Sequence, residues 1–226
     1  MRRVLAIDPG TSKTAAVLLE HIGSKIVRSE EFVCGSNQVM VKNNFNFSLW
    51  QNVVREALSY FSRNNKIKNC DTVITLPRGL INFERETYDR KKANLKKLLR
   101  LREKDQLKVY LEPLLGRHEI FWPFITRALY LGLLDFFRRE KLKLRQIYFS
   151  LPFYSTFAEP DNFVILNLGG RGCDMLLYQQ KELQRIVSFQ AGGEQVVNDI
   201  ALVQQVSENL ARNKFFSTDR LFESFF

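Results

Sequence analysis

The sequence Asp8-Pro9-Gly10-Thr11-Ser12-Lys13 separates two apolar runs, at residues 4–7 and 14–19. A glycine in such a turn lets backbone amides approach an anion with no side chain in the way. Residues 167–174, with the sequence Asn-Leu-Gly-Gly-Arg-Gly-Cys-Asp, lie in the same way between two further apolar runs. One such turn is typical of an ordinary β-hairpin. The pair predicts two phosphate loops that face each other across one nucleotide cleft.

A glycine pair that opens a predicted helix, Gly192-Gly193, completes a set of three motifs. In these motifs the sequence resembles the actin-like ATPases, which share a fold with the Hsp70 chaperones and sugar kinases, and in particular the cell-division protein FtsA and the pilus-assembly protein PilM. The family motifs read Asp-x-Gly-Thr-Ser-Lys, Asp-x-Gly-Gly-Gly-Thr-Thr-Asp and Gly-Gly-x-x-x-Thr-x-Asp-Ile-Ala. The matching residues are Asp8, Gly10, Thr11, Ser12, Lys13, Gly169, Gly170, Asp174, Gly192, Gly193, Asp199, Ile200 and Ala201. The resemblance covers residues 2–76 and 119–212.

The resemblance implies a role for each motif and a cofactor, ATP or ADP with magnesium. In the first turn, Thr11, Ser12 and Lys13 would contact phosphate, and Asp8 would hold magnesium through water. The backbone amides of the second and third motifs would approach the ligand at Gly169, Gly170, Gly192 and Gly193, with Asp174 ending the second motif. The family's adenosine-binding Gly-Gly turn has no counterpart before Phe226. We therefore expect weak nucleotide binding, and between a natural reduction and a C-terminal truncation we favour the truncation.

Departures from the family motifs bear on catalysis. Asn167 replaces the acidic residue that helps to hold magnesium-bound water, so the charge that would orient the attacking water is missing. Arg171, Gly172 and Cys173 replace a Gly-Thr-Thr run, and Val197 replaces a threonine. An arginine can pair with phosphate, but it is bulky where the backbone must come close. We expect binding rather than turnover, and weak or absent ATP hydrolysis.

The order of the predicted elements indicates an α/β protein with a duplicated ribonuclease-H-like (actin-like) fold. We expect mixed five-stranded sheets flanked by helices, with the second half truncated. Ser48 is suited to cap the first long helix. Strands are expected at residues 3–8, 14–20, 25–33, 71–76, 146–151 and 182–190, and helices at 48–63, 123–139 and 194–212. The predicted domains are a first subdomain at 1–76 and 119–152, an inserted basic segment at 77–118, and a partial second subdomain at 153–226.

The net charge of +10 is concentrated in two segments. Residues 78–108 contain eleven basic and five acidic residues, and residues 138–145 contain five basic and one acidic residue. Such a surface attracts nucleic acid, anionic lipid or an acidic protein, although a solvated helix face has the same composition. Residues 89–109 contain no aromatic side chain to stack on bases, so we expect no nucleic-acid partner.

The remaining composition indicates a cytoplasmic protein. No apolar run reaches the ~20 residues of a membrane span, and Asp8 interrupts any signal-peptide core. The three cysteines are scattered, and the two histidines lack neighbouring ligands, so neither a disulfide framework nor a metal site is expected. The Phe-rich residues 215–226 are expected to pack on protein rather than to anchor in a membrane.

Three functions remain open from the sequence. The first is an actin-like nucleotide-binding scaffold for bacterial cell division or for pilus or secretion assembly, located at the inner face of the membrane through its protein partners and able to self-associate. The second is a non-catalytic interaction module with a degenerate nucleotide site. The third is a ribonuclease-H-like nuclease resembling Holliday-junction resolvases, for which Glu84, Asp174 and Asp199 would have to join Asp8 around metal ions.

Overall fold

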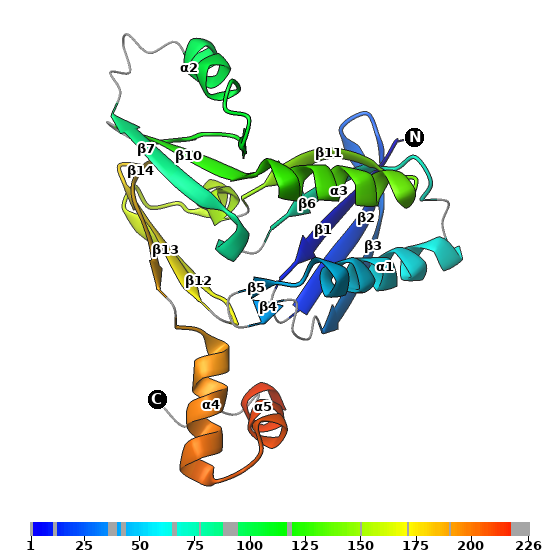
Figure 1. Ribbon diagram of the computed structural model, residues 1–226, viewed down its shortest axis with the longest axis vertical. Coiled ribbons are helices and arrows are strands. Elements are labelled where there is room, and N and C mark those ends of the chain that lie inside the picture. The colour runs from blue at the N-terminus through cyan, green and yellow to red at the C-terminus, as the bar shows by residue number, and fades with distance from the viewer. Residues whose placement is uncertain are drawn as a thin grey trace. The chain divides into compact units, whose positions relative to one another are not determined.

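The computed structural model describes most of the chain (Figure 1). The chain divides into two compact units. One unit contains residues 1–165 and 176–185, and the other contains residues 166–175 and 186–226. The described residues are 2–10, 13–35, 40–41, 44–64, 67–76, 78–87, 95–116, 119–149, 151–170, 172–189 and 191–217.

The first sheet has five strands in the order β11-β6-β1-β2-β3. The first three strands of the chain form an antiparallel meander, and β6 and β11 continue the sheet in parallel beside β1. This is the arrangement expected of a ribonuclease-H-like half. The strands are β1 (Arg2–Pro9), β2 (Lys13–Ile22), β3 (Lys25–Gly35), β6 (Asp71–Thr75) and β11 (Lys143–Tyr148).

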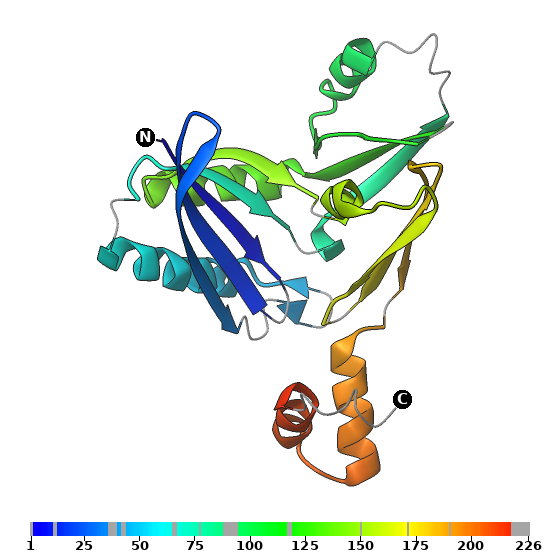
Figure 2. The ribbon, with the colours of Figure 1, turned by 180° about the vertical axis from the view of Figure 1, so that it is seen from behind.

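Helices α1 (Phe47–Asn64) and α3 (Arg127–Arg139) lie side by side on one face of this sheet, in front of it in Figure 1 and behind it in Figure 2. Aromatic side chains join the two helices, because the ring of Trp50 contacts that of Phe136 with centroids 5.4 Å apart. Alternate residues of β1 point into this core, and Leu5 and Ile7 are 0% and 2% exposed. Burial of such side chains contributes about 1.5–3 kcal/mol each. The core therefore holds β1, including Asp8 and Pro9 at its end.

A second sheet contains β7 (Asn82–Thr87), β8 (Lys108–Tyr110) and β10 (Glu119–Thr126), in the order β7-β10-β8, with β9 (Leu114–Leu115) also paired to β10. Helix α2 (Leu95–Arg102) belongs to the same region. The short elements are β4 (Met40–Val41) paired with β5 (Asn44–Phe45), and the 3-10 helices η1 (Arg78–Leu80) and η2 (Leu151–Phe157).

The third sheet has the order β12-β13-β14, formed by β12 (Phe163–Leu168), β13 (Cys173–Gln179) and β14 (Glu182–Phe189). Gln180 and Lys181 both have positive φ in the turn between β13 and β14, as in a type I′ hairpin. Two helices follow, α4 (Gly193–Gln204) and α5 (Glu208–Ser217). The order of elements thus repeats the three-stranded meander and helix that open the chain.

Several boundaries differ from the sequence expectation. The helix expected from residue 123 begins at Arg127, because the hydroxyl of Thr126 accepts a hydrogen bond from the Leu129 amide and caps it. Pro123 lies instead in β10, which pairs with β7, so the inserted sheet extends to residue 126. Asn46 rather than Ser48 caps α1, since its side chain accepts from the Leu49 amide at 3.0 Å.

Two further differences concern the second half of the chain. The strand expected at 146–151 lies at Lys143–Tyr148. The single helix expected at 194–212 is two helices, because Gln205 adopts a left-handed conformation with φ of 51° that ends α4. The division into two units passes through β12, β13 and β14, and the predicted domains at 1–76 with 119–152, 77–118 and 153–226 stay a prediction.

Candidate functional site

The first glycine turn lies at the carboxyl ends of parallel strands. Strands β1, β6 and β11 run in parallel, so they end at the same edge of the first sheet, with Asp8, Thr75 and Tyr148 near their ends. Such an edge is the usual place for ligand binding in α/β sheets. The side chain of Asp8 is exposed there, and its Oδ1 accepts a hydrogen bond from the Thr75 hydroxyl. Thr75 thereby orients the carboxylate that the first motif supplies.

Gly10 is required by the tightness of this turn. Its amide donates to the Asp8 carbonyl at 3.1 Å, and a Cβ at this position would lie 2.7 Å from the Lys13 carbonyl oxygen. Only glycine fits so close an approach without a shift of the backbone. Lys13 is exposed at the start of β2, beside the turn. Thr11 and Ser12, the predicted phosphate contacts, lie outside the described residues, so their role stays a prediction.

The second glycine turn and the Gly-Gly helix start form one structure. The Gly193 amide donates to the Gly169 carbonyl at 3.0 Å, and the Glu194 amide donates to the Gly170 carbonyl at 2.7 Å. A Cβ on Gly192 would lie 2.5 Å from the first of these oxygens and 2.6 Å from the second. The first amides of a helix have no partner within the helix. Here the turn provides partners for two of them, which joins the second and third motifs.

The acidic residue of the second motif has a structural partner. Asp174 is 3% exposed, and its Oδ1 accepts a hydrogen bond from the Ser188 hydroxyl at 2.6 Å. This contact links β13 to β14. Asn167, the position that carries an acid in the family, is exposed on β12 and carries no charge. Arg171 lies outside the described residues. The second turn thus retains its backbone shape, and its buried carboxylate hydrogen-bonds within the protein.

Sequence reasoning did not identify Thr75 or Ser188 as partners. Each lies far along the chain from its carboxylate, and neither belongs to a motif, so no local signal was available. The sequence also predicted no role for Thr14 beyond its place in the second strand. The hydroxyl of Thr14 is fully buried next to the first turn and has no hydrogen-bond partner within the described part of the chain.

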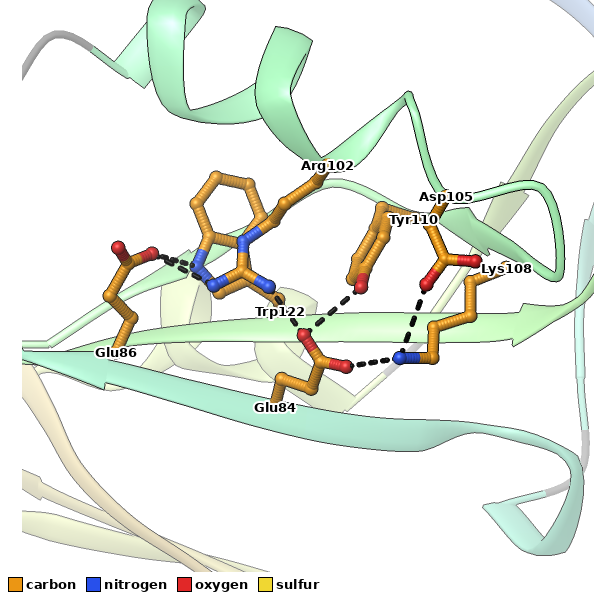
Figure 3. Close-up of polar contacts among 7 residues, drawn as sticks. All are labelled: Glu84, Glu86, Arg102, Asp105, Lys108, Tyr110 and Trp122. Carbon is orange, nitrogen blue, oxygen red and sulfur yellow. Dashed lines mark hydrogen bonds and ion pairs between the residues drawn. The ribbon is translucent and has the colours of Figure 1, made fainter.

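Glu84, one of the carboxylates that the nuclease hypothesis required at the metal site, is bonded within a polar cluster of the inserted sheet (Figure 3). Glu84 accepts hydrogen bonds from Lys108 at 2.7 Å, from the Tyr110 hydroxyl at 3.0 Å and from Arg102. The bond from Lys108, with those from Tyr110 and Arg102, holds the pKa of Glu84 below its usual value despite partial burial. Glu84 is therefore a stable anion within its own cluster.

The same cluster attaches helix α2 to the sheet. Arg102 of α2 donates to Glu86 at 2.9 Å and lies over the Trp122 ring, 4.6 Å from its centroid. The indole nitrogen of Trp122 also donates to Glu86, at 3.1 Å. Lys108 pairs with Asp105 at 3.3 Å, and its bond to Glu84 raises its pKa. Figure 3 shows all seven side chains gathered between α2 and β7.

Over the described ranges, no group of three histidine, cysteine or carboxylate side chains is placed to hold a metal ion. A two-metal nuclease requires several carboxylates at one point. None of the helices described is both long and apolar enough to cross a membrane.

No protein-family model matches the chain, and no curated protein does. Solved structures do match. A PilM–PilN type IV pilus biogenesis complex is 14% identical, with a TM-score of 0.66 over 92% of this chain and 67% of that one. The ethanolamine utilization protein EutJ from Carboxydothermus hydrogenoformans is 10% identical, with a TM-score of 0.57 over 94% of this chain and 61% of that one. MreB 5 of Spiroplasma citri bound to AMPPNP is 12% identical, with a TM-score of 0.54 over 94% and 61%.

The chain has the actin-like ATPase fold. This actin-like chain spans between 61% and 67% of the length of those structures. At such low identity the likeness establishes the arrangement of strands and helices. The two glycine turns of this actin-like protein lie in different compact units, and the nucleotide cleft between them stays a prediction.

Proposed function

We propose that the protein is a nucleotide-binding scaffold that holds ATP or ADP with magnesium weakly and hydrolyses ATP slowly or not at all. The observation that carries this proposal is the Asp8 carboxylate. It is exposed at the carboxyl end of a parallel strand, it is oriented by Thr75, and it is followed by a turn that only glycine can form. A carboxylate placed in this way suits a magnesium ion with its bound waters.

The first turn fits a phosphate group as well as a metal. The exposed Lys13 supplies a positive charge beside the tight backbone of Gly10, and this combination is common where phosphate binds. Magnesium would neutralise phosphate charge and position the nucleotide in such a site. Thr11 and Ser12 would complete the phosphate contacts.

The second turn supports binding rather than hydrolysis. Two amides that would otherwise point at a ligand, those of Gly193 and Glu194, donate to carbonyls of the turn itself. Asp174 is buried against Ser188, and Asn167 has no charge with which to orient an attacking water. Gly169, Gly170, Gly192 and Gly193 then set the shape of the site, and the ligand is held chiefly by the first turn.

The solved structures of the same fold suggest the cellular setting. One is a PilM–PilN complex of type IV pilus biogenesis, and another is an MreB protein bound to a nucleotide analogue. By this analogy we place the protein among the protein partners of a pilus, secretion or cell-division assembly at the inner face of the membrane. Self-association belongs to the same proposal.

Titration calorimetry with magnesium-ATP tests the nucleotide site. The wild type should bind, and Asp8→Asn should weaken binding about tenfold or more, which corresponds to about 1.4 kcal/mol. Asp161→Asn is the matched control, because Asp161 is an exposed aspartate whose side chain forms an ion pair with Lys181 at the long distance of 3.9 Å. Equal affinity of the wild type and Asp8→Asn, or no binding at millimolar nucleotide, contradicts the proposal.

A non-catalytic interaction module is the second candidate, and the exposed Asn167 favours it. Leu166 and Leu168, on either side of Asn167, are 55% and 74% exposed, which suits contact with another protein. A protein of this kind would crystallise with an empty site in excess nucleotide while a partner co-purifies. That result, together with the absence of calorimetric binding, would replace the first candidate by the second.

A further inference from the structure

Helix α2 and the turn that follows it expose cations and leucines together. Residues 95–108 contain six basic and two acidic residues. Two of the basic residues, Arg102 and Lys108, are half-buried and bonded to Glu84, Glu86 and Asp105. The cluster of Figure 3 thus neutralises the inner side of this segment.

The anchored side chain decides which residues of α2 face outward. Arg102 lies over Trp122, so Arg100, two positions before it on α2, is turned away from the sheet. Lys104 lies in the turn that follows α2. Both are exposed, and within the described residues neither has an acidic partner. Leu101, between them, is 53% exposed, and Leu107 is 78% exposed. The segment at residues 100–107 therefore exposes two cations and two leucines, together with the acidic side chain of Glu103.

The composition of this surface restricts its partner. Residues 89–109 contain no aromatic side chain for bases to stack on. Cations around exposed leucines match the headgroup and acyl regions of an anionic membrane surface.

We propose that residues 95–107 form a peripheral docking surface for an anionic lipid bilayer. The leucines enter the boundary between headgroups and acyl chains, and Arg100 and Lys104 contact the lipid phosphates. This surface is separate from the Phe-rich residues 215–226, and it does not depend on the nucleotide site. Binding by so few side chains is weak and is screened by salt, so it orients a protein that its partners already hold near the membrane.

Vesicle sedimentation tests this surface. The wild type should sediment with vesicles of phosphatidylglycerol and phosphatidylcholine, and it should remain in solution with phosphatidylcholine alone or at high salt. Each cation near an anionic surface contributes about fivefold in partitioning, so R100Q/K104Q should bind about 30-fold more weakly. Leu101→Gln should reduce binding without changing its salt dependence.

Arg85→Gln is the matched control. Arg85 is an exposed arginine of β7 that alternates with Glu84 and Glu86, so it lies on the opposite face of the inserted sheet. This variant should bind anionic vesicles with nearly the affinity of the wild type, because its cation lies away from the proposed surface. Thermal unfolding of each variant checks its fold, which the exposure of the substituted side chains should preserve. Failure of the wild type to bind anionic vesicles, or equal losses in R100Q/K104Q and Arg85→Gln, overturns the proposal. Binding to soluble polyglutamate but not to the vesicles would assign the surface to an acidic protein instead.

Discussion

The two three-stranded meanders, β1–β3 and β12–β14, share an order of strands and differ in what lies beside them. Parallel strand β6 pairs with β1 and supplies Thr75 to Asp8. Strand β12 is at the edge of its sheet as far as the structure describes it. Ile7 precedes Asp8 and is 2% exposed, whereas Leu166 precedes Asn167 and is 55% exposed. The carboxylate of the first turn is thus bonded by a residue of a neighbouring parallel strand, whereas the carboxylate of the second turn is bonded by Ser188 from within its own meander.

Truncation of the two equivalent side chains should produce the largest contrast. Ile7→Ala should lower the free energy of unfolding by about 3 kcal/mol, because it removes buried methyl groups beneath α1 and α3 and leaves a cavity. Leu166→Ala should change it by less than about 0.5 kcal/mol, since the side chain is already half in solvent. Urea denaturation of both variants measures the difference. Similar losses in the two would show that Leu166 is covered in solution, which would remove the contrast between the meanders.

The second turn should be most sensitive at Gly192. Gly192→Ala would bring a Cβ against two carbonyl oxygens and separate the amides of Gly193 and Glu194 from their acceptors. We expect the free energy of unfolding to fall by about 2 kcal/mol. Amide hydrogen exchange in α4 and circular dichroism during urea denaturation measure it.

Gly132→Ala is the control for this glycine. The added Cβ would meet the Phe47 ring at 3.4 Å, an ordinary contact, and alanine favours the helix. This variant should be neutral or slightly more stable. If Gly192→Ala is equally neutral, the second turn is looser than the structure shows, and its amides are available to a ligand after all.

The smallest effects should come from the two hydroxyl groups that hold the carboxylates. Ser188→Ala should lower the free energy of unfolding by about 1 kcal/mol, because it removes a hydrogen-bond donor to the buried Asp174. Thr75→Val should change stability by less than about 0.5 kcal/mol, since Asp8 is exposed, yet it should weaken magnesium-ATP binding. Denaturation and calorimetry on both variants separate the two roles. If Ser188→Ala weakens magnesium-ATP binding and Thr75→Val does not, the second turn and not the first holds the nucleotide.

Much of the fold could be predicted from the sequence because its signals are local. The apolar runs around residues 8–13 and 167–174 predicted the strands of both meanders, and the glycines marked the turns between them. Boundaries were less predictable. Pro123 was expected in a helix, but pairing of β10 with β7 keeps it in a strand, and a single left-handed residue, Gln205, divides the last helical region.

The candidate site was predictable in its residue types and not in its contacts. Asp8 and Gly10 belong to one short motif, so their neighbourhood follows from covalent connection. Thr75 and Ser188 lie on other strands, 67 and 14 residues from their partners. Their roles depend on which strands pair in the fold, and a short sequence motif does not contain that information. The cluster that fixes α2 likewise combines residues of one helix, three strands and the turn that contains Asp105.

By itself, the sequence determined the duplicated α/β meander, the two glycine turns and the loss of an acid at Asn167, because chain connectivity and hydrophobic period carry this information. Only the tertiary structure decided how the groups at the turns are used. In the folded protein, the Asp8 carboxylate accepts a hydrogen bond from the Thr75 hydroxyl at the exposed edge of the sheet. The first amides of α4 donate hydrogen bonds to carbonyls of the second turn. The reason is physical: a hydrogen bond requires two groups within about 3 Å of each other, and that proximity is created by folding.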